Sequence, residues 1–101
     1  MVRHIVLFQF RTDVDEATRE IVRNTFKKSI MSLLHKLDFI HNLEVGFNIN
    51  KAEEWDICLS GTFDTLDDVK TYSQFPDHRA AADKLKEYLS SRSCVDYEIQ
   101  Y

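Results

Sequence analysis

The sequence contains little glycine, proline or cysteine: two, one and two residues among 101. So few turn formers, with no repeats or low-complexity tracts, favour a chain of regular helices and strands joined by short loops. Two cysteines, Cys58 and Cys94, are too few for a disulfide framework or a cysteine metal cluster, and we interpret them as small apolar side chains in strands. No His, Asp or Glu pair has convincing ligand spacing either, so we predict no metal site.

The sequence also lacks an excess of positive charge and any long apolar run. The formal net charge is −4, which argues against binding nucleic acid through its phosphates. The apolar start, "MVRHIVLFQF", is interrupted at Gln9 and is too short for a signal peptide or a membrane span. We therefore expect a cytoplasmic protein without nucleic-acid or membrane partners. The length predicts a single domain over residues 1–101.

Hydrophobic periodicity predicts the order of the elements. Apolar residues alternate at 2–10, 43–49, 55–63 and 94–101, which predicts strands, the middle two joined as a hairpin by a loop of four or five residues. Helical spacing predicts a long helix of about six turns after "TDVDEATRE", a short one capped by Thr65 with Asp68, and one from Pro76 to about residue 91. We expect Ile49, Leu66 and Leu89 to face inward in these elements.

The order strand, helix, strand, strand, split helix, strand predicts a ferredoxin-like α+β fold: a four-stranded antiparallel sheet with helices on one face. Its usual strand order (fourth, first, third, second) separates the two cysteines by roughly 9 to 10 Å, too far for a disulfide. The sheet face turned away from the helices is expected to carry Ile5, Leu7, Cys58, Ser60 and Thr62. Such a surface favours a partner sheet, although polar residues on the same face leave a monomer open.

The stretch "YSQFPDH" places Tyr72 and His78 on either side of Pro76. If Pro76 opens a helix, His78 lies in its first turn and faces the sheet, where the positive end of the helix dipole disfavours imidazolium. His4 alternates with Val6 and Phe8 on the helix-facing side of the first strand and points into the same space. Such a group could supply a base and an oxyanion donor. From the residues alone, a purely structural role at the helix junction stays open.

Several segments together resemble the stress-responsive α/β-barrel (Dabb) family: "MVRHIVLFQFR", "LEVGFNI", "GTFDTLDDVKTY", "FPDHRAA" and "VDYE". The resemblance covers essentially the whole chain. It implies a homodimer in which two sheets pack into an α/β barrel with the helices outside.

The resemblance also extends to plant polyketide cyclases of this family. It implies that Tyr72 and His78 are catalytic, with His78 as the base of an aldol ring closure that needs no metal or cofactor, and that His4 lines the pocket. Ile57 and Phe75 stand where the cyclases have histidines, so the pocket is less polar and their reaction is not transferred.

We predict that a small, mostly apolar carbonyl-containing metabolite binds between helices and sheet. The expected substrate-binding residues are His4, Val6, Phe8, Ile57, Phe75 and Ala82. Three functions stay open: a cofactor-independent cyclase or lyase, a non-enzymatic stress-responsive or interaction protein, and a cofactor-free monooxygenase or isomerase of the same barrel class.

Overall fold

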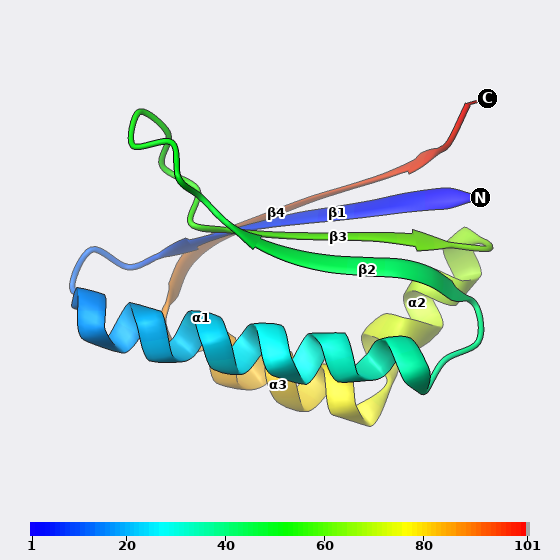
Figure 1. The fold of residues 1–101 in the computed structure, drawn as a ribbon, viewed down its shortest axis with the longest axis horizontal. Helices are drawn as coiled ribbons and strands as arrows, with labels where there is room; N and C mark the ends of the chain where they lie inside the picture. The colour runs from blue at the N-terminus through cyan, green and yellow to red at the C-terminus, as the bar shows by residue number, and fades with distance from the viewer. Residues whose placement is uncertain (101) are drawn as a thin grey trace.

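The computed structural model of the protein describes residues 1–100. The elements follow in the order β1 (Val2–Phe10), α1 (Glu16–Met31), the 3-10 helix η1 (Ser32–His35), β2 (Ile40–Phe47), β3 (Ile57–Phe63), α2 (Leu66–Gln74), α3 (Pro76–Lys86) and β4 (Leu89–Glu98). The strands form one antiparallel sheet in the order β2-β3-β1-β4, and the helices lie on one of its faces (Figure 1). The predicted ferredoxin-like α+β fold and its strand order are confirmed.

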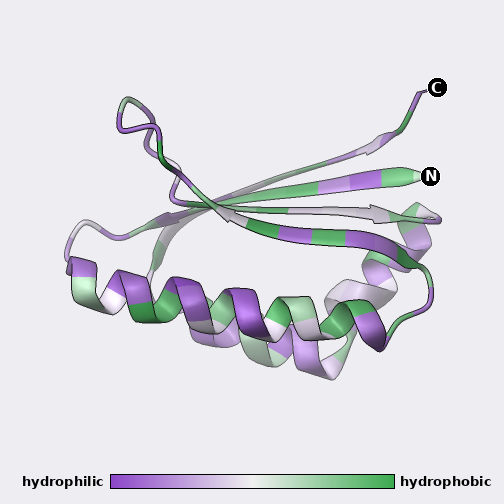
Figure 2. Ribbon diagram, viewed as in Figure 1, coloured by the Kyte–Doolittle hydropathy of each residue, from purple (hydrophilic) through white to green (hydrophobic). Residues whose placement is uncertain are grey.

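The hydrophobic core lies between the sheet and the helices. Every second residue of β1 is buried on the helix-facing side, as the alternation of its sequence requires. Hydrophilic and hydrophobic residues alternate along α1 (Figure 2), so that Phe26 and Ile30 reach the core while the other side of the helix meets solvent. Each large side chain buried in this way contributes about 1.5–3 kcal/mol to stability.

Short polar signals fix where the helices begin. Asp15 caps α1: its side chain accepts a hydrogen bond from an N–H three residues later, at 2.8 Å, and this bond lowers the pKa of Asp15. Thr65 caps α2 by accepting from the Asp68 N–H at 3.1 Å, as its spacing predicts. Pro76 occupies the start of α3 after Phe75 takes an extended conformation, which separates α3 from α2.

The β2–β3 connection is longer than the sequence predicts. It covers residues 48–56, and Ile49, which we expected in a strand, is 95% exposed. The side chain of Asn48 accepts a hydrogen bond from the Asn50 N–H at 2.7 Å, and the side chain of Asn50 accepts one from the Ala52 N–H at 3.1 Å. These local bonds compete with the strand ladder and end β2 at Phe47.

The expected ends of two helices and the expected inward position of Leu66 were also wrong. The α-helical part of α1 ends at Met31 and tightens into η1, so the long helix is shorter than six α-turns. Leu66 is the first residue of α2 and is 46% exposed, because it lies at the end of the helix rather than over the core. The helix α3 ends at Lys86, and Leu89 begins β4 because it pairs with Phe10 of β1.

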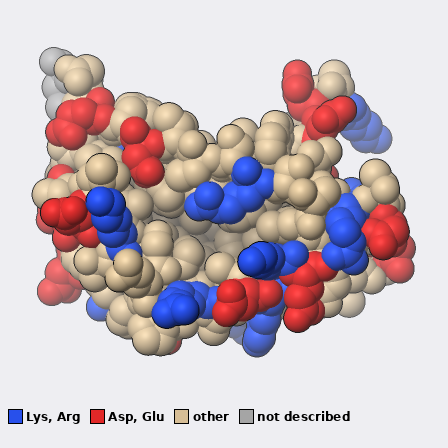
Figure 3. Space-filling view, turned by 180° about the vertical axis from the view of Figure 1, so that it is seen from behind, with Lys and Arg blue, Asp and Glu red and all other residues tan. Residues whose placement is uncertain are grey.

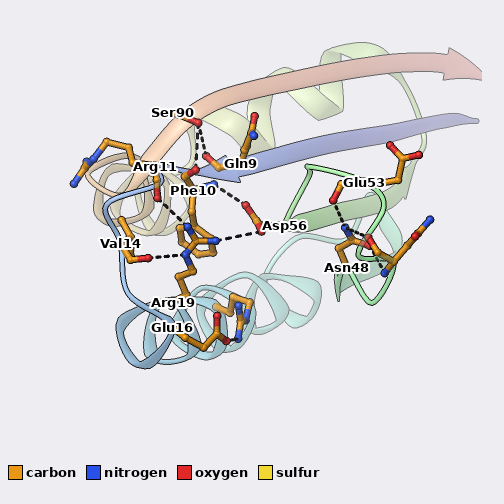
Figure 4. A network of polar contacts seen from close by, with 12 residues as sticks. Gln9, Phe10, Arg11, Val14, Glu16, Arg19, Asn48, Glu53, Asp56 and Ser90 are labelled. Atoms are coloured by element: carbon orange, nitrogen blue, oxygen red, sulfur yellow. Dashed lines mark hydrogen bonds and ion pairs between the residues drawn. The ribbon is translucent and has the colours of Figure 1, made fainter.

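Asp56, at the end of the β2–β3 loop, ties this loop to the end of β1 and to α1 (Figure 4). Its Oδ2 accepts a hydrogen bond from the backbone N–H of Phe10 at 2.8 Å, and its Oδ1 lies 3.7 Å from the guanidinium of Arg19. Arg19 also donates to the carbonyls of Val14, at 2.8 Å, and Arg11, at 3.0 Å. One carboxylate and one guanidinium thereby join β1, α1 and the connection.

The sheet face turned away from the helices is partly apolar. It carries half-buried Ile5 and Leu7, and on the edge strand β4 it carries Val95 and Tyr97, which are 53% and 43% exposed. The expected continuation of this row at Ile99 lies past the end of β4, and Tyr101 lies outside the described residues.

Cys58 and Cys94 are both free thiols, as the strand order predicts. Among residues 1–100, no helix has the length and apolar character needed to cross a membrane.

Candidate functional site

A cavity of about 440 Å³ lies between α3 and the β1–β4 half of the sheet. This volume falls in the range of small-molecule sites. Its lining follows β1 from His4 to Phe8 and faces His78 and Ala82 on α3. The rest of the apolar wall is supplied by Val6, Phe26, Leu59 and Leu89. The cavity therefore offers an apolar body with two histidines at one place on its wall.

Three polar rings meet at this part of the wall. The rings of Tyr72 and His78 lie 4.5 Å apart between centroids, and those of His4 and Tyr72 lie 6.1 Å apart. Tyr72 is fully buried. Neither its hydroxyl nor the Nδ1 atom of His78 has a hydrogen-bond partner among residues 1–100. Buried polar groups without partners are rare in folded proteins, and each needs a physical explanation.

Burial sets the protonation of both groups. It lowers the pKa of His78, and the nearby His4 and Arg92 lower it further, although the backbone of Ser73 opposes the shift. Burial also raises the pKa of Tyr72 far above its ordinary value. Near pH 7 the site therefore combines a neutral imidazole, which can accept a proton, with a protonated phenol, which can donate a hydrogen bond.

His4 is held in place by the neighbouring strand. It pairs with Asp96 of β4, and its Nδ1 lies 2.6 Å from the Asp96 carboxylate. A carboxylate at Nδ1 favours the tautomer with its proton on that nitrogen and fixes the direction of the ring. The thiol of Cys94 lies 3.7 Å from both groups, and burial with the charge of Asp96 raises its pKa, so it stays a thiol rather than a reactive thiolate.

His4, Cys94 and Asp96 also have the composition of a metal site, since their ligand atoms lie within 4.8 Å of one another. The geometry favours a hydrogen bond instead. Ligand atoms held at about 2.0–2.3 Å from a tetrahedral zinc ion lie roughly 3.3–3.8 Å apart. The contact between His4 and Asp96 is 2.6 Å, so these two groups would have to separate before an ion could enter.

The structure places the predicted site residues in two groups. The cavity is lined by His4, Val6, Phe8, His78 and Ala82. Tyr72 contacts the rings of both histidines but does not line the cavity. Ile57 is buried on β3, from which Leu59 alone reaches the lining, and Phe75 is half-buried at the α2–α3 junction. These two residues are not brought to the cavity.

One side of the cavity was not predicted from the sequence. Asp83 and Lys86 on α3, and Ser90, Ser91 and Arg92 on β4, also line it. We expected a helix to continue to about residue 91, and so did not place these β4 residues in a strand. The available signal was the spacing of Arg92, Cys94 and Asp96, which puts them on one face of β4 beside the alternating residues of β1.

Comparison with known proteins identifies the family. Residues 2–99 match the sequence model of the stress responsive A/B barrel domain. The chain belongs to this family. No curated protein matches it. A dimeric protein of unknown function with a ferredoxin-like fold from Bacteroides fragilis is 48% identical, with a TM-score of 0.93 over 97% of this Dabb chain and 95% of that one.

More distant solved structures share the fold of this Dabb protein. A hydroxynitrile lyase from Passiflora edulis is 14% identical, with a TM-score of 0.76 over 98% of this chain and 93% of that one. A putative antibiotic biosynthesis monooxygenase from Nitrosomonas europaea is also 14% identical, with a TM-score of 0.81 over all of both chains. At these identities the likeness concerns the fold alone.

Proposed function

We propose that this Dabb protein binds a small, mostly apolar carbonyl-containing metabolite in the cavity between α3 and β4 and acts on it as a cofactor-independent lyase or cyclase. One observation carries the proposal: the wall of the cavity includes a half-buried, neutral His78 whose buried Nδ1 has no partner among residues 1–100, packed against Tyr72, whose hydroxyl has none either. A carbonyl ligand has the chemistry that such a pair can serve.

Each of the three rings has its own role. His78 accepts a proton from the carbon beside the carbonyl, because its imidazole is neutral at pH 7. Tyr72 donates a hydrogen bond to the oxygen that gains negative charge, and this requires the ligand carbonyl to reach between the rings of His4 and His78. His4, fixed by Asp96, orients the ligand. The apolar walls exclude water from the reacting atoms.

The relatives support this class of chemistry by analogy of fold. The structural neighbour from Passiflora edulis is a hydroxynitrile lyase, and the neighbour from Nitrosomonas europaea is described as a putative monooxygenase. A monooxygenase or isomerase would also use an apolar cavity of this kind, but the pairing of a neutral histidine with a protonated tyrosine favours proton transfer.

Exchange of a proton for deuterium tests the base without knowledge of the natural substrate. We expect wild-type protein in D₂O to accelerate exchange beside the carbonyl of 2-nonanone, measured by ¹H NMR. The His78→Gln variant should lose roughly a hundredfold of this acceleration, and Tyr72→Phe a smaller part. His35→Gln makes the same change at an exposed histidine of η1 and should exchange like wild type. Binding of 2-nonanone by the wild-type protein without accelerated exchange would favour the non-enzymatic alternative.

We also propose that two copies of the chain associate through the sheet face away from the helices. The Bacteroides fragilis relative is dimeric, and this face exposes Val95 and Tyr97 beside Ile5 and Leu7. Sedimentation should give twice the monomer mass for wild type and a shift toward the monomer for Tyr97→Asp. An unchanged mass for this variant would place the interface elsewhere.

Finally, we propose that residues 1–101 act as a single domain in the cytoplasm. The two free thiols, one of them exposed, favour a reducing compartment.

A further inference from the structure

The rim of the cavity carries two cations. Lys86, in the last turn of α3, and Arg92, on β4, both line the cavity, and neither forms an ion pair with any of residues 1–100. Asp83 is the one acidic residue of the lining and is likewise unpaired within that range. Figure 3 shows this side of the molecule, where Lys and Arg side chains flank a hollow. The rim is therefore net positive on a chain whose formal net charge is −4.

Arg92 is the more informative of the two. A lysine near the C-terminus of a helix is favoured by the helix dipole, so Lys86 alone indicates no ligand. Arg92 is not at a helix end: it pairs with Phe8 in the sheet and lies two residues before Cys94 on the same face of β4. Its guanidinium lies close enough to contribute to the lowered pKa of His78, so that rim and base belong to one site.

We propose that the ligand of this cavity carries an anionic end group, a carboxylate or a phosphate, which Arg92 and Lys86 bind at the rim while its apolar body lies along the walls. The inference rests on the proposed function and specifies its substrate class. A guanidinium forms two parallel hydrogen bonds to either anion, and an ammonium adds a second charge. Because the two cations come from β4 and α3, an anion between them is contacted from both sides of the opening.

The helix α3 sets the distance between the two ends of the ligand. His78 and Lys86 are eight residues apart on this helix, which corresponds to roughly 12 Å along its axis. A carbonyl beside His78 and an anion beside Lys86 are thus separated by a chain of medium length. The compound 9-oxodecanoate, with a ketone near one end and a carboxylate at the other, has this arrangement, and its methyl ester is a neutral counterpart of nearly the same shape.

Isothermal titration of both compounds at low salt tests the inference. We expect wild-type protein to bind 9-oxodecanoate roughly tenfold more tightly than the ester, and 0.5 M salt to narrow the difference. Arg92→Gln and Lys86→Gln should each weaken binding of the acid by roughly three- to tenfold and leave the ester unchanged. Arg92→Lys, which keeps the charge but loses the planar fork, should fall between wild type and Arg92→Gln.

The matched controls remove the same charges from outside the cavity. Lys84→Gln acts in the same turn of α3 as Lys86, and Arg79→Gln removes an exposed guanidinium from that helix; both should keep the wild-type preference for the acid. A preference for 9-oxodecanoate or for 8-oxononyl phosphate tells which anion the rim selects, and either supports the inference.

Two results would overturn the inference, and they are distinguishable. If the ester binds as tightly as the acid, or if Lys84→Gln weakens the acid as much as Lys86→Gln, the anion site is refuted while the carbonyl site of the proposed function stands. If neither compound binds wild-type protein, the proposed function fails and the anion site fails with it. An amide NMR spectrum like that of wild type shows in each case that the variant is folded.

Discussion

Replacing Tyr72 by phenylalanine should stabilise the folded protein. The residue is 0% exposed, and its hydroxyl has no hydrogen-bond partner among residues 1–100, so folding removes its water without returning a bond. An unpaired buried polar group costs about 1–3 kcal/mol. The substitution leaves a void of roughly one oxygen atom, which costs only a few tenths of a kcal/mol at about 24 cal/mol per Å³. The free energy of unfolding should therefore rise by about 1–2 kcal/mol.

Thermal unfolding followed by circular dichroism measures this gain. For a domain of this size each kcal/mol corresponds to roughly 4–8 °C, so Tm should rise by at least about 4 °C. Both proteins must be compared at the same concentration, because association also raises Tm. Tyr88→Phe is the matched control: this residue is half-buried and its hydroxyl forms no hydrogen bond within residues 1–100, so Tm should stay near that of wild type.

An unchanged or lower Tm for Tyr72→Phe would refute this reasoning. It would show that the hydroxyl has a partner in solution and that Tyr72 and His78 serve to close the α2–α3 junction. A more stable variant that also loses ketone exchange would show the opposite: the hydroxyl is kept at the expense of stability because the ligand needs it.

Three further predictions concern pH, the half-buried carboxylate of Asp56 and the two glycines. Burial lowers the pKa of His78 in the folded protein below its ordinary 6.5, so its stabilising contribution is present above about pH 6.5 and is lost as the pH falls through the folded-state pKa. Urea unfolding should show that the free energy of unfolding falls less between pH 7.5 and pH 5.0 in His78→Gln than in wild type. Equal losses in the two proteins would contradict the pKa shift. Asp56→Ala should lower the free energy of unfolding by about 1–3 kcal/mol, because the Phe10 N–H loses its acceptor. Asp56→Asn keeps an acceptor and should lower it less. Denaturant midpoints compare the two variants, and equal costs would show that the hydrogen bond to Phe10 does not contribute to stability. Gly61→Ala should lower the free energy of unfolding by about 1–3 kcal/mol, since its Cβ would lie 2.9 Å from an aromatic carbon and 3.3 Å from a backbone oxygen. Gly46→Ala is the control: a Cβ there meets nothing within 4 Å, so the substitution should be neutral or slightly stabilising. Equal unfolding free energies for the two variants would show that the sheet relaxes around the methyl group at residue 61.

The fold could be predicted because burial is periodic in β1 and in α1. The alternation of β1 and the helical spacing around Phe26 and Ile30 mark which side of each element meets the core. The boundaries depended on competing contacts that periodicity does not report. The side chains of Asn48 and Asn50 end β2 early, and pairing with Phe10 draws Leu89 into the sheet.

The contrast between local patterns and long-range contacts also explains which parts of the candidate site could be predicted. Tyr72 and His78 could be grouped with His4, because a proline at a helix start and the alternation of a strand both fix side-chain directions locally. Spacing alone puts Arg92 and Asp96 on one face of β4, but their place beside the three rings depends on the register of β4 against β1, which is set by contacts between opposite ends of the chain.

The edge strand β4 serves two surfaces at once. Arg92 lines the cavity and Asp96 holds His4 on the same face of β4, while Val95 and Tyr97 face the other side of the sheet, where we place a second copy of the chain. Both binding events contact the same strand, and we predict that they are coupled. By reciprocity, the factor by which association strengthens ligand binding equals the factor by which ligand strengthens association. The apparent affinity of the cavity should therefore depend on protein concentration, and a diluted sample should bind its ligand more weakly than a concentrated one.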